Sequence, residues 1–128
     1  MGALVRRGTA FTQLGVGRSR RVPVELLWSP RDPLAVRLGF PDEHLVWILS
    51  RESLFDALAG SGRVGEGDVR FFPDPGTRGL VLELRGVDCT AAFQVERGVL
   101  AAFLAVTVAQ ESLDPCVALD AWLVGGAG

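Results

Sequence analysis

The sequence predicts an α+β domain in which a run of antiparallel strands is followed by a helix, twice along the chain. Three observations predict it. Several short segments alternate apolar and polar residues with the period of two that half-buried strands show. Two other segments, 50–59 and 96–110, carry apolar residues at helical spacing. Each helical segment follows a group of strand segments, so the chain repeats one architecture without visible sequence identity between its halves.

The first group of strands is expected in residues 9–50. A strand at 9–15 is followed by a turn at 15–21, and the next two strands cover 22–28 and 34–40. In the second and third strands, one face of each is predicted to point inward: Val22, Val24, Leu26 and Trp28, then Leu34, Val36, Leu38 and Phe40. Pro41-Asp42 predicts a hairpin turn, because proline presets φ and aspartate can bond its own backbone.

The fourth strand segment, "EHLVWILS" at 43–50, is apolar on both faces. Such a strand is expected to be covered on both sides. The helix 50–59 begins at Ser50, a good N-cap, and ends at Gly60, which predicts a glycine stop.

A glycine motif follows this helix, with Gly60, Gly62 and Gly65 in the G-x-G-x-x-G spacing that cradles a pyrophosphate in some proteins. That fingerprint works as a turn from a strand into a helix, whose N-terminal N–H groups face the phosphates. Here the order is reversed, because a helix precedes the glycines and a strand at 68–73 follows them. The motif therefore predicts a helix-to-strand connection that needs glycine backbone freedom.

The second group of strands is expected at 68–73, 80–85 and 89–95, with a loop at 73–79 and a turn at 86–88. The residues predicted to point inward are Leu80, Leu82 and Leu84, then Cys89, Ala91, Phe93 and Val95.

The helix 96–110 has no charged residue between Arg97 and Glu111. Its predicted core stripe is Val99, Leu100, Phe103, Val106 and Thr107, and its other face carries Ala101, Ala102 and Ala105. That alanine face predicts an oligomer interface or burial under the C-terminal segment; equally, alanines can favour helix on an exposed face. In the tail, Val117, Leu119, Trp122 and Leu123 could form a short helix.

Length and composition predict one domain over residues 1–128, with a core at about 8–108 and a C-terminal extension at 109–128. Hydrophobic residues make up 48% and the mean hydropathy is +0.30, which is high for a monomer of this length. Charges interrupt each apolar run before the roughly 18 to 20 residues that a membrane span requires. The surplus apolar surface therefore predicts contact with another protein chain and no membrane span.

Charge is distributed unevenly around a net −2. Residues 1–21 hold five arginines and no acid, whereas the rest of the chain carries eight arginines against 15 acids. This basic arm could attract an anionic partner, or it could be a solvated strand and turn.

Residue types that carry catalysis and metal binding are scarce. His44 is the one histidine, and Cys89 and Cys116 lack metal-ligand spacing. We therefore predict no catalytic, cofactor or metal site, a cytoplasmic location and two reduced thiols.

Three segments carry a further pattern: "VPVELLWSPRDPLAVRLGF" at 22–40, "VWILSRESLFDAL" at 46–58 and "GEGDVRFFP" at 65–73. Together they resemble the SsgA-like sporulation and cell division family of actinomycetes, which Trp47, Arg51 and Leu54 of the second segment match. The chain departs from the family where tyrosine is usual, at Trp28 and Leu34, and where tryptophan is usual, at Phe72.

The resemblance implies a fold of two antiparallel β-layers with two helices, similar to the whirly nucleic-acid binders and assembled as a trimer. It implies a non-enzymatic adaptor that brings FtsZ to division septa or controls another SsgA-like protein that does so. Single-stranded nucleic-acid binding is the alternative, which the pI of 5.3 disfavours. The candidate interface residues are Trp28, Glu66, Asp68, Phe72, Ala101, Ala102 and Ala105, where Glu66 and Asp68 either face a partner or cap backbone N–H groups in a turn.

Overall fold

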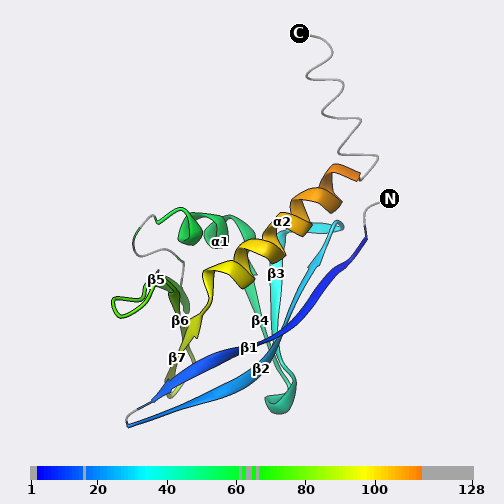
Figure 1. Ribbon diagram of the computed structural model, residues 1–128. Coiled ribbons are helices and arrows are strands. Elements are labelled where there is room, and N and C mark those ends of the chain that lie inside the picture. Colours follow the sequence, from blue (N-terminus) through cyan, green and yellow to red (C-terminus); the bar gives the residue numbers. More distant parts are fainter. Residues whose placement is uncertain (1–2, 16, 61, 63–64, 66, 114–128) are drawn as a thin grey trace.

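The computed structural model describes residues 3–15, 17–60, 62, 65 and 67–113 (Figure 1). In these residues, seven strands and two α-helices form the domain. The strands are β1 (Val5–Gly15), β2 (Arg18–Ser29), β3 (Asp32–Phe40), β4 (Leu45–Ser50), β5 (Val69–Pro73), β6 (Leu80–Arg85) and β7 (Thr90–Val95). The helices are α1 (Arg51–Leu58), α2 (Arg97–Leu113) and a short 3-10 turn η1 (Pro41–Glu43). The predicted α+β class and the order of strands and helices are confirmed.

All seven strands belong to one antiparallel sheet in the order β4-β3-β2-β1-β7-β6-β5. Two separate layers are therefore not confirmed. The two groups of strands join through three residue pairs between β1 and β7, from Thr12↔Gln94 to Leu14↔Ala92. The sheet is strongly curled. Phe40 is in β3 and Phe93 is in β7, and β2 and β1 lie between these two strands in the sheet, yet the ring centres of the two residues are 5.3 Å apart. Both helices lie across one end of the curled sheet (Figure 1).

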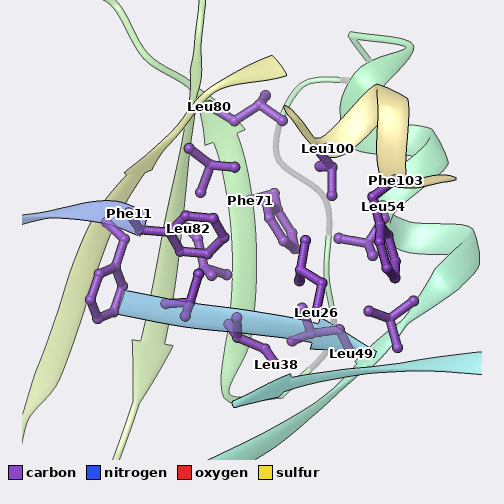
Figure 2. Packing of buried hydrophobic residues seen from close by; sticks show 14 of the residues in the cluster. Phe11, Leu26, Leu38, Leu49, Leu54, Phe71, Leu80, Leu82, Leu100 and Phe103 are labelled. Atoms are coloured by element: carbon purple, nitrogen blue, oxygen red, sulfur yellow. The ribbon is translucent and has the colours of Figure 1, made fainter. Parts of the chain in front are cut away.

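The core fills the concave side of this sheet, as Figure 2 shows for part of it. The predicted inner face of β2 is confirmed, since Val22, Val24, Leu26 and Trp28 are all buried. In β3, Val36, Leu38 and Phe40 are buried but Leu34 is 78% exposed. The prediction for Leu34 is wrong because the pairing of β3 with β4 begins at Ala35↔Ser50, which leaves Leu34 without a neighbouring strand on that side.

In the second half, the buried residues Leu80, Leu82, Leu84, Phe93 and Val95 confirm the predicted inner faces of β6 and β7. Ala91 is half-buried. The prediction for Cys89 is wrong: its side chain is exposed because it lies in the β6–β7 turn, where its carbonyl accepts the N–H of Gly86 at 2.7 Å.

Helix α2 covers the core with Leu100, Phe103, Leu104 and Thr107, which are all buried. These positions follow the i, i+3, i+4, i+7 pattern of one helix face. Val106 was expected in this stripe and is 47% exposed, and Val99 is half-buried. Leu104 takes the place predicted for Val106, because Val106 lies on the opposite side of the helix.

Strand β4 differs most from expectation. It is an edge strand, paired with β3 alone, and Leu45, Val46 and Ile48 are 54%, 63% and 58% exposed. Leu49 is buried. The prediction that both faces of this segment are covered is therefore wrong for the described chain.

The predicted helix boundaries are confirmed at α1. The Ser50 hydroxyl accepts the backbone N–H of Ser53 at 3.2 Å, which is an N-cap bond. After the helix, Gly60 has φ +78, which is the left-handed backbone of a glycine stop. The glycines that follow connect α1 to β5, as their position between a helix and a strand predicts.

The β5–β6 loop contains a carboxylate that makes stability depend on pH. The carboxylate of Asp74 accepts the backbone N–H of Gly76 at 3.0 Å and the Gln94 side-chain amide at 2.8 Å, and these bonds hold the pKa of Asp74 below its ordinary value of 3.8. A pKa that is lower in the folded state stabilises the fold above the unfolded-state pKa, and this contribution is lost as pH falls through the folded-state pKa. We expect Asp74→Asn to be less stable than the natural chain at pH 7 and the difference to shrink below pH 3.8, as measured by urea unfolding.

Candidate interaction surfaces

A buried arginine fixes the position of both helices. Arg51, the first residue of α1, donates from Nη1 to Oε2 of Glu111 at 3.0 Å and from Nε to the Thr107 hydroxyl at 3.2 Å. Its guanidinium also lies 5.3 Å from the ring centre of Trp28 and 5.4 Å from that of Phe55. These contacts hold the C-terminal half of α2 against α1 and β2, so the opposite side of α2 faces outward.

The outward side of α2 is apolar along its length. We call it the outer α2 face, and its residues are Ala101, Ala102, Ala105, Val106, Val108 and Ala109, all of which are exposed. No charged residue occurs between Arg97 and Glu111. Small side chains on such a face let the backbone of another helix approach closely. The three alanines proposed from the sequence therefore lie together on one surface.

The other sequence-predicted interface residues lie apart from this face. Trp28 is 1% exposed and donates from Nε1 to the carbonyl of Pro33 at 3.1 Å, so it is a core residue that a partner could not reach. Phe72 is half-buried on β5, the opposite edge strand from β4. Asp68 is exposed just before β5, and its carbonyl accepts the N–H of Arg85 at 2.8 Å. Glu66 lies outside the described residues.

The sequence analysis does not identify the exposed apolar surface of β4 as a candidate site. The sequence pattern that could have identified it is "LVWILS", which has no charge and is apolar on both faces. The same pattern is typical of an internal strand, which is what the sequence analysis predicts here. A groove of about 550 Å³ lies beside Leu45, Val46 and Trp47 and reaches Leu84 and Phe93 on the opposite wall. A second groove, of about 310 Å³, lies between Ile48 of β4 and Val69 and Phe71 of β5.

The basic N-terminal arm forms most of the β1–β2 hairpin. Pairing of the two strands extends to Gly15↔Arg18, so Arg18, Arg20 and Arg21 lie in β2 and the connection is shorter than the predicted turn at 15–21. Three of its arginines lie near carboxylates: Arg6 at 3.6 Å from Glu25, Arg20 at 3.3 Å from Glu43 and Arg21 at 4.0 Å from Glu96. These pairs lower the positive potential that an oligonucleotide backbone would meet.

Weak binding of nucleic acid is the result expected from this pairing. We expect no retardation of a single-stranded oligonucleotide in a gel at micromolar protein and low salt. A salt-dependent shift at that concentration would instead favour the nucleic-acid alternative.

Within the described part of the chain, no three His, Cys, Asp or Glu side chains gather closely enough to hold a metal ion. Cys89 is an exposed free thiol, and Cys116 lies outside the described residues. His44 lies after η1 with φ 54, and its backbone N–H donates to the carbonyl of Pro41. Neither of the two described helices has the length and apolar character needed to cross a membrane.

Comparison with known proteins gives one family. Residues 22–113 match the family model for SsgA, described as a Streptomyces sporulation and cell division protein. A similar solved structure comes from work on mutations in SsgB that correlate to longitudinal cell division during sporulation of Streptomyces coelicolor; it is 26% identical over 85% of this chain and 87% of that chain, with a TM-score of 0.75. Another is an SsgA-like sporulation-specific cell division protein from Thermobifida fusca, 27% identical over 98% and 96% of the two chains, also with a TM-score of 0.75. No curated protein matches the sequence significantly.

Proposed function

The chain belongs to the SsgA family of sporulation and cell division proteins, and from this premise we propose that it is a non-enzymatic adaptor in sporulation-associated septation. The adaptor acts in the cytoplasm, at division septa, by binding other proteins of the division machinery. FtsZ and other SsgA-like proteins are the partners that this role requires. No reactive group needs to be positioned for such a role.

The outer α2 face carries the proposal. A helix that is apolar on its exposed side and lacks charge over 13 consecutive residues, 98–110, favours burial against another protein. We assign it to contacts between copies of this chain in a homotrimer, centred on Ala101, Ala102 and Ala105. We assign Asp68, which is exposed just before β5, to the contact with a partner of the division machinery, together with Phe72 of the same edge strand.

Assembly can be tested at one alanine. We expect the natural chain to be a trimer by light scattering and Ala105→Glu to weaken assembly by about 100-fold, because burying an unpaired carboxylate costs about 3 kcal/mol. Val87→Glu is the matched control, since Val87 is fully exposed in the β6–β7 turn, away from α2. Equal trimer stability in both variants would remove the outer α2 face as the subunit contact.

Partner binding needs its own measurement. We expect the natural chain to sediment with FtsZ filaments, and Asp68→Lys to sediment less while remaining a trimer. A chain that is monomeric and stays in the supernatant with FtsZ filaments would contradict the adaptor role.

A further inference from the structure

The free edge of β4 is an unusual surface. Beyond β4, no described strand pairs with the sheet, so half of the backbone N–H and C=O groups of Leu45–Ser50 point away from β3 without a strand to meet them. Natural edge strands are protected from pairing by charges, proline, bulges or a covering segment. "LVWILS" contains neither charge nor proline, and its pairing with β3 is regular from Phe40↔Leu45 to Ala35↔Ser50. A covering segment is the remaining means of protection.

The space beside β4 suits an extended apolar segment. The smaller groove, of about 310 Å³, follows the C-terminal half of β4 at Ile48 and Leu49, and the larger, of about 550 Å³, follows its N-terminal half at Leu45 and Val46. Most of the side chains that line the two grooves are apolar, from Phe71 at one end to Phe93 at the other, and Arg20 and Glu43 also line the larger groove. A strand placed along β4 would direct side chains into both grooves.

The chain itself supplies a segment that starts at the right place. Glu111, two residues before the end of α2, contacts Arg51, which directly follows the last residue of β4. The described part of α2 therefore ends near the C-terminal end of β4, and in the sequence that follows Pro115 disfavours helical backbone at the residue before it. A chain that runs from here along β4 toward Leu45 is antiparallel to it.

Length and composition also fit. Six residues of β4 extend over about 20 Å, and nine residues, 116–124, extend over about 30 Å. This segment, "CVALDAWLV", has one charge in nine residues. In an extended backbone one face would carry only Val117, Leu119, Ala121 and Leu123, and the other would carry Asp120 among apolar residues. Only an extended backbone can pair with the outward N–H and C=O groups of an edge strand; a helix would leave them unpaired.

We propose that residues 116–124 of the same chain pair antiparallel with β4 as an eighth strand and cover its exposed edge. The inference is independent of the adaptor function, because it concerns an intramolecular contact at β4, and no residue of the outer α2 face lines either groove.

A disulfide test uses the native Cys116. In the full chain with Cys89→Ser, Ile48→Cys introduces a thiol on β4 at a position that is already exposed. With oxidised glutathione we expect an intrachain bond to Cys116, at least tenfold faster than with Val87→Cys. Val87 is also exposed, but it lies in the β6–β7 turn, whose Gly86 and Cys89 line the groove beside the N-terminal half of β4, at the other end from the expected position of Cys116. Non-reducing electrophoresis separates an intrachain bond from a bond between two copies, and a bond between copies would overturn the proposal.

Hydrogen exchange gives a second readout that does not depend on the register of the two strands. We expect the amides of Leu45–Ser50 to exchange at least tenfold more slowly in the natural chain than in the full-length double variant Leu119→Asp, Leu123→Asp. The amides of β2, which pairs with β1 on one side and β3 on the other, serve as the internal control and should exchange equally in both proteins. Equal exchange of β4 in both proteins would overturn the proposal whatever the disulfide result.

Discussion

Replacing Arg51 with alanine should lower the free energy of unfolding by about 3 kcal/mol, because a buried ion pair that loses one partner leaves the other uncompensated. The side chains of Arg51 and Glu111 are 11% and 31% exposed, so the loss is at the lower end of what fully buried pairs show. The same substitution removes the donor to the Thr107 hydroxyl and the stacking on Trp28. Unfolding in urea, followed by tryptophan fluorescence, measures the loss.

Two further variants separate the parts of this effect. Arg51→Lys keeps the charge but not the planar group that reaches Glu111 and Thr107 together, so we expect it to recover about half of the lost stability. Glu111→Gln keeps a hydrogen-bond acceptor and should cost about 1 kcal/mol. If Arg51→Ala lowered the free energy of unfolding by no more than Glu111→Gln does, the guanidinium of Arg51 would not be the group that holds α2 against α1.

The strands were predictable where one face is buried and the other is not. In β2, the alternation of Val22, Val24 and Leu26 with polar or exposed neighbours identified both the strand and its inner face. The N-cap Ser50 and the stop at Gly60 identified α1, because both act within one helical turn. Each of these signals depends only on residues that are close together in the sequence, so the sequence alone is enough to identify them.

The features that were missed depend on contacts between distant residues. β4 is apolar on both faces, and this pattern is the same for an internal strand as for an edge strand that a further segment covers. Leu104 was missed because a helix that is apolar on nearly every side does not show which side faces the sheet. The local sequence pattern around Arg51 is that of an exposed residue at the start of a helix. Arg51 is nevertheless buried, because it binds Glu111 and Thr107, which are 60 and 56 positions away in the sequence.

The candidate surfaces divide in the same way. The outer α2 face was predictable from the absence of charge over three helical turns, and Ala101, Ala102 and Ala105 lie there together. Trp28 was proposed for an interface because aromatic residues anchor partners, yet its indole N–H meets the carbonyl of Pro33 and its ring fills the core. An aromatic residue in a strand gives no local sign of which of these two roles it has.

The glycine motif gives the sharpest test of the backbone argument. Gly65 has φ +136, where residues with a Cβ rarely occur, and a Cβ at this position would overlap the carbonyl oxygen of Val69 and lie 3.0 Å from Cα of Arg70. Both neighbours are backbone atoms of β5, so neither can rotate away. We expect Gly65→Ala to lower the free energy of unfolding by about 3 kcal/mol, from backbone strain and from displacement of the start of β5.

The other glycines provide matched controls. At Gly60, Gly62 and Gly67 a Cβ would meet no atom within 4 Å, although φ is positive at each. Alanine at any of these three should therefore cost about 1 kcal/mol, which is the penalty of a left-handed backbone alone. A phosphate cradle requires close approach at Gly60 and Gly62, whereas a helix-to-strand connection requires only that Gly65 pass beside β5. We expect the loss of unfolding free energy to be largest at Gly65, because only there would a Cβ meet the backbone of β5. Equal losses at Gly60, Gly62 and Gly65 in urea unfolding would contradict the conclusion that Gly65 is the glycine that the helix-to-strand connection requires.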